Sequence, residues 1–172
     1  MHESSTESSS ISISTSKANR LLLINRLTEQ ATEVDGFITG LTEEQLKERP
    51  EPDGWSLHEL VVHLAMRQDL FVDRVARMLV EEMPELHSLD EDTIIQRDRL
   101  LEELVQHRFR GYQEQRKNLL GLLSSLDEQR WRAEAIHPTV KHYSVEKCVE
   151  SFMRFEASVL REMFQIFFGV RE

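Results

Sequence analysis

The chain has 172 residues, of which 40% are hydrophobic and 30% are charged, as is usual for one globular domain. Its 31 acidic and 21 basic residues give a formal net charge of -10. Neither a nucleic acid nor an anionic membrane is therefore expected as a partner, because both attract concentrated positive charge. The one cysteine, Cys148, excludes an internal disulfide and a cysteine-based zinc site, and it fits a cytoplasmic location.

Residues 1–16 are expected to form a disordered tail, because eight of them are serine and none is aromatic. They also lack the basic and apolar regions of a secretory signal. Residues 17–172 are expected to form the domain. None of their stretches approaches the roughly 20 apolar residues that a membrane-spanning helix needs.

Apolar residues spaced three and four apart predict a helix over residues 24–41, with the stripe of a helix packed in a bundle. The second helix should start at Ser56, because Ser56 and Glu59 can form a capping box. In this motif each side chain bonds the backbone amide of the other residue. Trp55 lies where a hydrophobic staple would pack on Leu60.

The third helix begins either at a second possible capping box, Ser88–Glu91, or near Leu100, and its apolar stripe ends at Leu126. The fourth helix should start near Ser144. Its apolar stripe assigns one carboxylate, Glu156, to the core. Four amphipathic helices predict an all-α fold, for which a four-helix bundle is the economical arrangement.

Two polar residues interrupt these stripes, as the site residues of a bundle do. His63 lies at the edge of the second stripe, where Glu59 can orient its ring or a neighbouring carbonyl can satisfy it. Glu156 in the core must be paired, metal-bound or protonated. The simpler alternatives are a drifting stripe that leaves this carboxylate exposed, or an ion pair with Arg67, Arg108 or Arg116.

Other candidates carry weaker signals. His58 is expected to be a solvated residue of the first helical turn, and Cys148 a small buried hydrophobe. His137 and His142 flank a loop and can line the mouth of a pocket, although histidines are commoner on the surface. The sequence lacks a glycine-rich phosphate loop and the two helical Glu-x-x-His pairs that a di-iron bundle needs.

The segment Trp55–Leu64 resembles the signature of the DinB/YfiT-like superfamily, with Trp and Ser before the helix, Glu inside it, and then a His-Leu pair. The third helix and the close of the fourth, Phe164–Ile166, are similar too, and the resemblance spans roughly residues 18–169. It implies an up-down-down-up four-helix bundle that is often dimeric. In that course the second and third helices are parallel, so most of 84–99 must cross the bundle and the third helix starts near Leu100.

Many members of this superfamily bind a divalent metal, such as zinc or nickel, through one histidine of the second helix and a pair four residues apart on the fourth. The resemblance implies His63 as the first ligand. The fourth helix then offers Ser158 with Glu162 in one register, or Glu156 with Leu160 in another, and no histidine in either. A tight zinc site usually has three or more protein ligands. The metal site, His63 with Glu156 and Glu162, is therefore expected to be degenerate, and the pocket around it to include Glu59, Ser158 and His142.

These observations favour a protein that binds a small molecule or a partner in the cleft of the bundle. One alternative is a metal-dependent enzyme like the thiol transferases of the superfamily, and another is an interaction protein that only dimerises. A homodimer is expected from the resemblance and from apolar residues outside the stripes, such as Val61, Val62, Leu120 and Leu122. We further expect His63 and Glu156 to face each other as a hydrogen-bonded pair.

Overall fold

The computed structural model describes residues 4–87 and 97–169, with side chains from residue 16 onward and, after the gap, from residue 99. Four long helices make up a bundle, which confirms the all-α fold expected from the sequence: α1 (Ser4–Ile38), α3 (Leu57–Val80), α5 (Val105–Ser125) and α7 (Val145–Phe168). The shorter elements are α2 (Glu43–Lys47), α4 (Arg97–Leu100), α6 (Glu128–Trp131), β1 (Glu134–Ala135) and β2 (Tyr143–Ser144).

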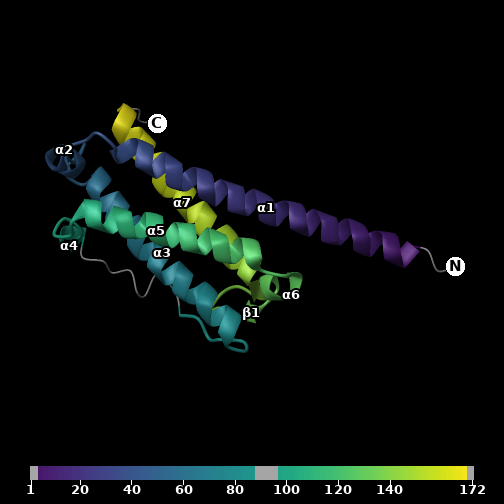
Figure 1. Ribbon diagram of the computed structural model, residues 1–172. Coiled ribbons are helices and arrows are strands. Elements are labelled where there is room, and N and C mark those ends of the chain that lie inside the picture. The colour runs from purple at the N-terminus through teal and green to yellow at the C-terminus, as the bar shows by residue number, and fades with distance from the viewer. Residues whose placement is uncertain (1–3, 88–96, 170–172) are drawn as a thin grey trace.

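The course of the four long helices is up-down-down-up. Helices α1 and α7 run in one direction, and α3 and α5 run in the other (Figure 1). Helix α7 packs against both α1 and α3, and α5 packs against α3 and α1, so the core lies between all four. Because α3 and α5 are parallel, the segment between them crosses the length of the bundle.

Two of the expected helix starts, at Ser56 and Ser144, are confirmed by their capping hydrogen bonds. The Ser56 hydroxyl accepts from the amide of Glu59, and the Glu59 carboxylate accepts from the amide of Ser56, so α3 begins with the predicted capping box. The Ser144 hydroxyl caps α7 by accepting from the amide of Lys147. These local bonds satisfy amides that a helix start leaves unpaired.

The third long helix, α5, starts at Val105, after the short helix α4 that ends at Leu100. This start fits the expectation of a third helix that begins near Leu100. The possible capping box at Ser88–Glu91 and the middle of the crossover expected over much of 84–99 lie outside the described residues.

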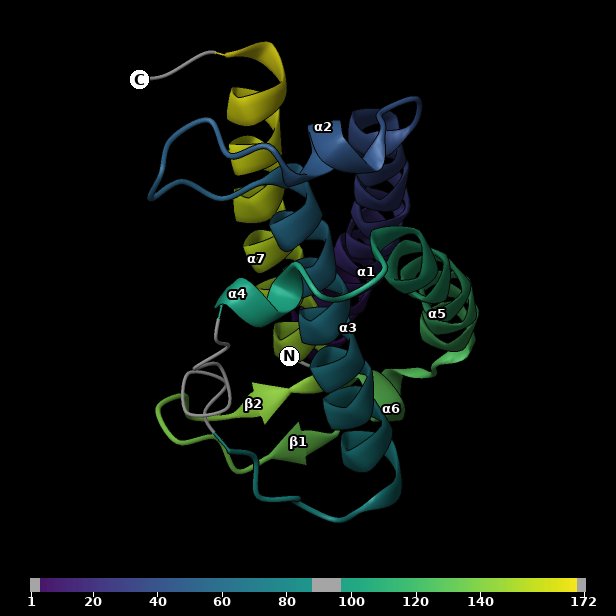
Figure 2. The same cartoon turned by 90° about the vertical axis from the view of Figure 1, so that its left-hand side faces the viewer.

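A two-stranded antiparallel sheet, which the sequence did not indicate, precedes α7. Strands β1 and β2 pair Ala135 with Tyr143, and Ile136 forms a further bridge to Glu85. Figure 2 shows this hairpin beside the C-terminal part of α3 and below the N-terminal end of α7. The hairpin therefore closes one end of the space between these two helices.

Helix α1 begins at Ser4, so most of the expected tail, 1–16, continues this helix and only 1–3 lie outside the described residues. Extending a formed helix costs far less than starting one, which lets the serine-rich sequence follow α1. Figure 1 shows that this N-terminal part projects beyond the other helices. Among the described residues, no helix is both long and apolar enough to cross a membrane.

Candidate functional site

Glu156 is fully buried, as the apolar phase of α7 predicted, and its carboxylate is paired inside the core. Arg116 of α5 donates to it at 2.7 and 3.1 Å, and the Tyr112 hydroxyl donates to it at 2.5 Å. Of the three arginines that the sequence offered, Arg116 is therefore the partner. Burial and the adjacent Glu156 carboxylate raise the pKa of Tyr112, which keeps its proton.

His63 lies between two aromatic rings. Its ring centroid is 5.2 Å from that of Trp55 and 5.6 Å from that of Phe155. The Nε2 atom is buried and has no hydrogen-bond partner among the described residues, while burial and the positive charge of Arg67 lower the pKa of His63. The expected His63–Glu156 hydrogen bond is therefore wrong. Phe155 and Glu156 are consecutive helical residues, which project about 100° apart, so only one of them turns toward His63.

Glu59 holds the start of α3 together. Its carboxylate accepts from Ser56 at 2.8 Å and from Arg49 at 2.5 and 3.1 Å, and the residue is fully buried. Burial alone would raise the pKa of Glu59, but the bonds from Arg49 and Ser56 outweigh burial and bring it to about 2. This carboxylate is ionised at neutral pH and contributes to a cap.

The remaining expected site residues lie apart from His63 or on the surface. Ser158 is exposed, and its hydroxyl donates to the Phe155 carbonyl at 2.6 Å. Glu162 lines a separate hollow of about 400 Å³ beside Trp55, where partial burial raises its pKa. The side chain of His142 is 80% exposed, with Nδ1 3.5 Å from a Glu134 oxygen, so it does not line a pocket.

His58 corrects another expectation. It is fully buried rather than solvated, because its Nε2 lies 3.0 Å from the Leu100 carbonyl at the end of α4. Burial lowers the pKa of His58. The crossover covers the first turn of α3, and a sequence pattern cannot show that contact.

The donors around His63 do not fit a metal of the superfamily type. Over the described residues, no three side chains of His, Cys, Asp or Glu lie close enough together to hold a metal ion. The neighbours of His63 are aromatic rings, and Glu156 is committed to Arg116. The three metal ligands that the resemblance implies, His63, Glu156 and Glu162, are therefore not brought together in this structure.

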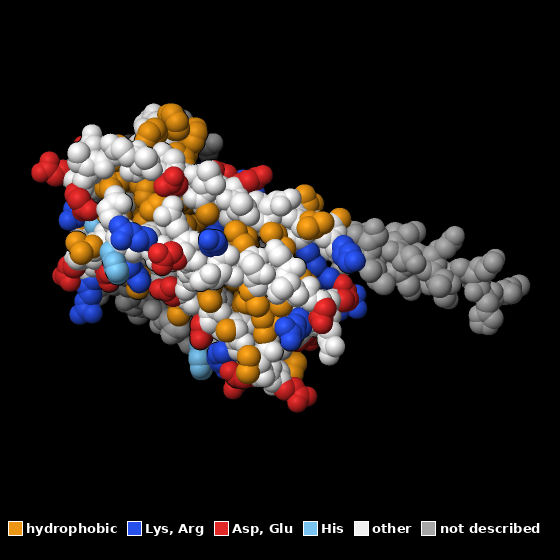
Figure 3. Space-filling model, in the orientation of Figure 1, with side chains coloured by type: hydrophobic (Ala, Val, Ile, Leu, Met, Phe, Trp, Pro, Cys, Tyr) orange, Lys and Arg blue, Asp and Glu red, His pale blue; other side chains and the backbone are white. Residues whose placement is uncertain are grey.

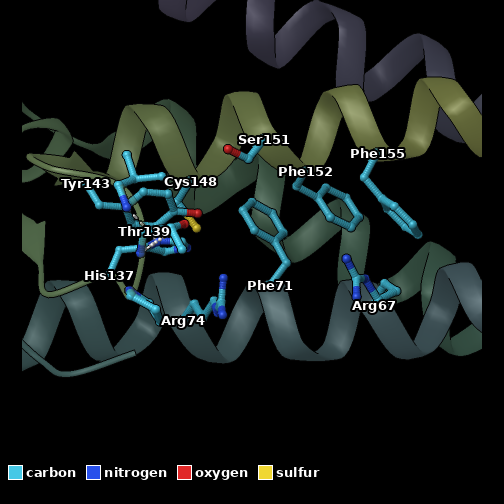
Figure 4. A pocket seen from close by; sticks show the side chains of 12 residues that line it. Arg67, Phe71, Arg74, His137, Thr139, Tyr143, Cys148, Ser151, Phe152 and Phe155 are labelled. Atoms are coloured by element: carbon cyan, nitrogen blue, oxygen red, sulfur yellow. Dashed lines mark hydrogen bonds between the residues drawn. The ribbon is translucent and has the colours of Figure 1, made fainter. Parts of the chain in front are cut away.

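A pocket of about 300 Å³ lies between α3 and α7 and is closed at one end by the hairpin loop (Figure 4). Phe71, Phe152 and Phe155 supply its apolar surface, and Phe71 and Phe152 stack face to face with centroids 4.4 Å apart. The other lining residues are mostly polar or come from the loop: Arg67, Arg74, His137, Pro138, Thr139, Val140, Tyr143, Cys148 and Ser151.

The polar end of this pocket is built around Arg74, which is 8% exposed and donates to the backbone carbonyl of His87. Nearby, the His137 ring packs 4.4 Å from Tyr143. The Nδ1 atom of His137 accepts from the amides of Thr139 and Val140, each at 3.2 Å. Burial and the charge of Arg74 lower the pKa of His137, so its ring is neutral at neutral pH.

Cys148 is buried as expected, and it lines the pocket without being a reactive thiol. Burial raises the pKa of the Cys148 thiol to about 11, although bonding with Tyr143 and the charge of Arg74 oppose this. Burial and Cys148 together raise the pKa of Tyr143. Both groups keep their protons at neutral pH, so the pocket lacks a thiolate nucleophile at Cys148.

Two parallel helices linked by a crossover, flanked by two that run in the opposite direction, define the chain as an up-down-down-up four-helix bundle protein. The model of the DinB superfamily matches residues 26–158, so the chain belongs to this superfamily. Among the solved structures, it is similar to YfiT from Bacillus subtilis, with a TM-score of 0.74 and 20% identity over 86% of this chain and 85% of that one. YfiT is described as "a probable metal-dependent hydrolase with an unusual four-helix bundle topology". A search of curated proteins finds no match.

Most residues of the α3–α7 pocket could not be predicted from the sequence. Arg67, Phe71 and Arg74 are spaced four and three apart, so they share a face of α3, and this spacing was the available signal. The facing residues of α7 and the loop could not be assigned without the register between the helices. His137, and not His142, is the histidine of this loop that lines the pocket.

Proposed function

We propose that the chain binds a small organic molecule in the pocket between α3 and α7, and that it does so with its own side chains rather than through a metal. The observation that carries this proposal is a cavity of about 300 Å³ lined by three phenylalanines and by several converging polar groups. Ligand pockets in proteins commonly have this composition, and their volumes start near 300 Å³. A small ligand therefore suits this cavity.

The neutral fluorescent probe N-phenyl-1-naphthylamine tests the proposal, because its emission rises when it enters an apolar cavity. We expect saturable binding to the wild-type chain. Ser151→Phe adds an aromatic ring to the pocket lining and should weaken binding at least tenfold. Ser124→Phe, on the exposed surface of α5, is the matched control and should bind like the wild type. Equal affinities in all three proteins would overturn the proposal.

The second candidate is a metal-dependent enzyme, with the hydrolase activity described for YfiT or the thiol transfer suggested by the superfamily resemblance. The observation in its favour is the buried Nε2 atom of His63, which has no bond among the described residues and belongs to the residue that the resemblance implies as the second-helix ligand. The absence of further ligands around it in the described residues counts against this candidate. Metal analysis separates the two functions.

A homodimer and a cytoplasmic location stay predictions. Val61 and Val62 are 2% and 0% exposed, so the expectation that they form a dimer face is wrong, because they pack inside the core of one chain. Figure 3 shows apolar side chains gathered at the C-terminal end of α7, where Phe164 and Phe168 are exposed. Light scattering at micromolar concentration should give twice the mass of one chain.

A further inference from the structure

The pocket between α3 and α7 contains a buried positive charge that no acidic side chain of the described residues neutralises. Arg74 is 8% exposed, and the His87 carbonyl that it bonds is a neutral group. Of the described residues that line the pocket, none is acidic, although the net charge of the chain is -10. A buried cation without an anion beside it is costly, so this pocket favours a ligand with a negative charge.

We infer that the ligand is an organic acid whose carboxylate lies against Arg74 and whose apolar body lies along Phe71, Phe152 and Phe155. This inference rests on the proposed function, and it adds the class of the ligand and its direction in the pocket. Figure 4 shows Arg74 next to His137 toward one end of the pocket, the Phe71 and Phe152 rings in the middle, and Phe155 toward the other end.

The end of the pocket at Arg74 offers hydrogen-bond donors. The two amides that bond Nδ1 of His137 make this atom an acceptor, so the proton of the neutral ring is on Nε2. Tyr143 keeps its phenolic proton because burial raises its pKa. Ser151 adds a hydroxyl group to the lining, while the Thr139 hydroxyl lies 3.4 Å from Nδ1 of His137. A carboxylate, which only accepts hydrogen bonds, is complementary to this set.

The charge at this end matches a carboxylate better than a phosphate. The Arg74 guanidinium can compensate one negative charge and bond both oxygens of a carboxylate, whereas a phosphate group carries about -1.5 to -2 charges. The other arginine of the lining, Arg67, lies seven residues earlier on α3, roughly 10 Å along the helix. Its guanidinium lies 4.6 Å from the centroid of the Phe155 ring, so it lies at the opposite end of the pocket from Arg74.

The test compares two ligands of the same shape, 4-phenylbutyrate and its primary amide, with 3-phenylpropyl phosphate as a third. Calorimetry on the full chain gives the three dissociation constants at pH 7. We expect the acid to bind at least about tenfold more tightly than the amide, as is usual for a charged hydrogen bond in a buried site. Arg74→Gln should remove this preference. Arg77→Gln, which removes a partly exposed arginine of α3 paired with Glu81, should preserve the preference.

The outcomes separate this inference from the proposed function. Equal affinities of the wild-type chain for the acid and the amide would overturn the inference that the ligand is a carboxylate, even if Arg74→Gln does not fold. Tighter binding of the phosphate, or loss of the acid preference in Arg67→Gln instead of Arg74→Gln, would overturn it as well. In each of these cases the small-molecule pocket would stand. If neither these ligands nor N-phenyl-1-naphthylamine bind, the proposed function itself fails.

Discussion

Arg116 of α5 and Glu156 of α7 form a two-point ion pair inside the bundle, with their side chains 2% and 0% exposed. The same guanidinium donates to the Leu27 carbonyl of α1 at 2.6 Å and to the Gln68 side chain of α3 at 2.8 Å. One buried arginine thus bonds a group from each of the other three long helices. Such a network is satisfied only when all four helices are in register, so it favours one packing arrangement.

We predict that Glu156→Gln destabilises the bundle by about 3–5 kcal/mol, because it leaves the Arg116 charge buried without its partner. The measurement is urea unfolding at pH 7. Asp69→Asn is the control, because it weakens an exposed ion pair with Arg108 and should cost no more than about 1 kcal/mol. The double variant Arg116→Met with Glu156→Leu should recover part of the loss. A cost below about 1 kcal/mol for Glu156→Gln would show that the pair does not form.

Glu59 predicts a pH dependence of stability. Its pKa of about 2 in the folded chain lies below the ordinary value of about 4.5, because Arg49 and Ser56 bond the carboxylate. The folded state is therefore favoured above pH 4.5, and this contribution is lost as the pH falls from about 5 toward 2. We expect Glu59→Gln to be less stable than the wild type by on the order of 2 kcal/mol at pH 7, a value reduced by the partial exposure of Arg49. Urea unfolding should show the difference between the two proteins shrinking steadily from pH 5 to pH 2.5, whereas Glu48→Gln, at an exposed position, should differ little from the wild type throughout.

The N-terminal part of α1 should contribute little to stability. Among the residues of this helix whose side chains are described, from Ser16 onward, Arg20 is the first that is buried, and it pairs with Glu128 and Glu146. We expect deletion of 1–16 to change the melting temperature by no more than about two degrees, whereas Arg20→Ala should lower it by several degrees. A drop of about 5 °C on deletion, on the order of 1–2 kcal/mol, would mean that this segment packs on the domain.

The helix starts could be predicted from the sequence because their causes are local. The Ser56–Glu59 cap and the Ser144 cap each depend on residues three positions apart. The hairpin could not be predicted in this way. Its strands have two residues each, and Ile136 pairs with the segment after α3, about fifty residues away in the chain. Pairing at that distance leaves no periodic pattern in a sequence.

The candidate site shows the same division between local and tertiary information. The apolar phase of α7 correctly placed Glu156 in the core, but it could not choose between Arg116 and the metal-site alternative. The choice depends on how α5 and α7 are rotated toward each other. His63 was expected to meet Glu156, and it meets the preceding residue, Phe155, because a small difference in helix rotation exchanges neighbours on the facing helix.

Metal loading should leave the chain without a stoichiometric ion. The motivation is the lack of a three-donor cluster in the described residues and the aromatic neighbours of His63. After incubation with zinc, nickel or manganese and removal of free ions, elemental analysis should give far less than one metal per chain. The wild type and His63→Ala should give the same low value. One metal per chain that is lost in His63→Ala would restore the metal-dependent enzyme as the function.

The last prediction concerns His63 itself. Its ring lies between Trp55 and Phe155, and its buried Nε2 atom has no hydrogen-bond partner in the part of the chain that the structure describes. An unsatisfied buried nitrogen destabilises the folded state. We therefore expect His63→Phe, which keeps a ring of similar shape and removes the unbonded nitrogen, to be as stable as the wild type or up to about 2 kcal/mol more stable at pH 7.

The pH dependence of the stability of His63→Phe tests whether the buried imidazole destabilises the wild type. Burial and Arg67 lower the pKa of His63 in the folded chain, so below about pH 6.5 the unfolded chain takes up a proton that the folded chain resists. The wild type should lose stability on this account as the pH falls from 7 to 5, and His63→Phe should not, so its advantage should grow. Urea unfolding of both proteins at pH 7, 6 and 5 measures the difference. A variant that is less stable than the wild type, or an advantage that shrinks at pH 5, would mean that His63 makes a favourable polar contact in the folded chain.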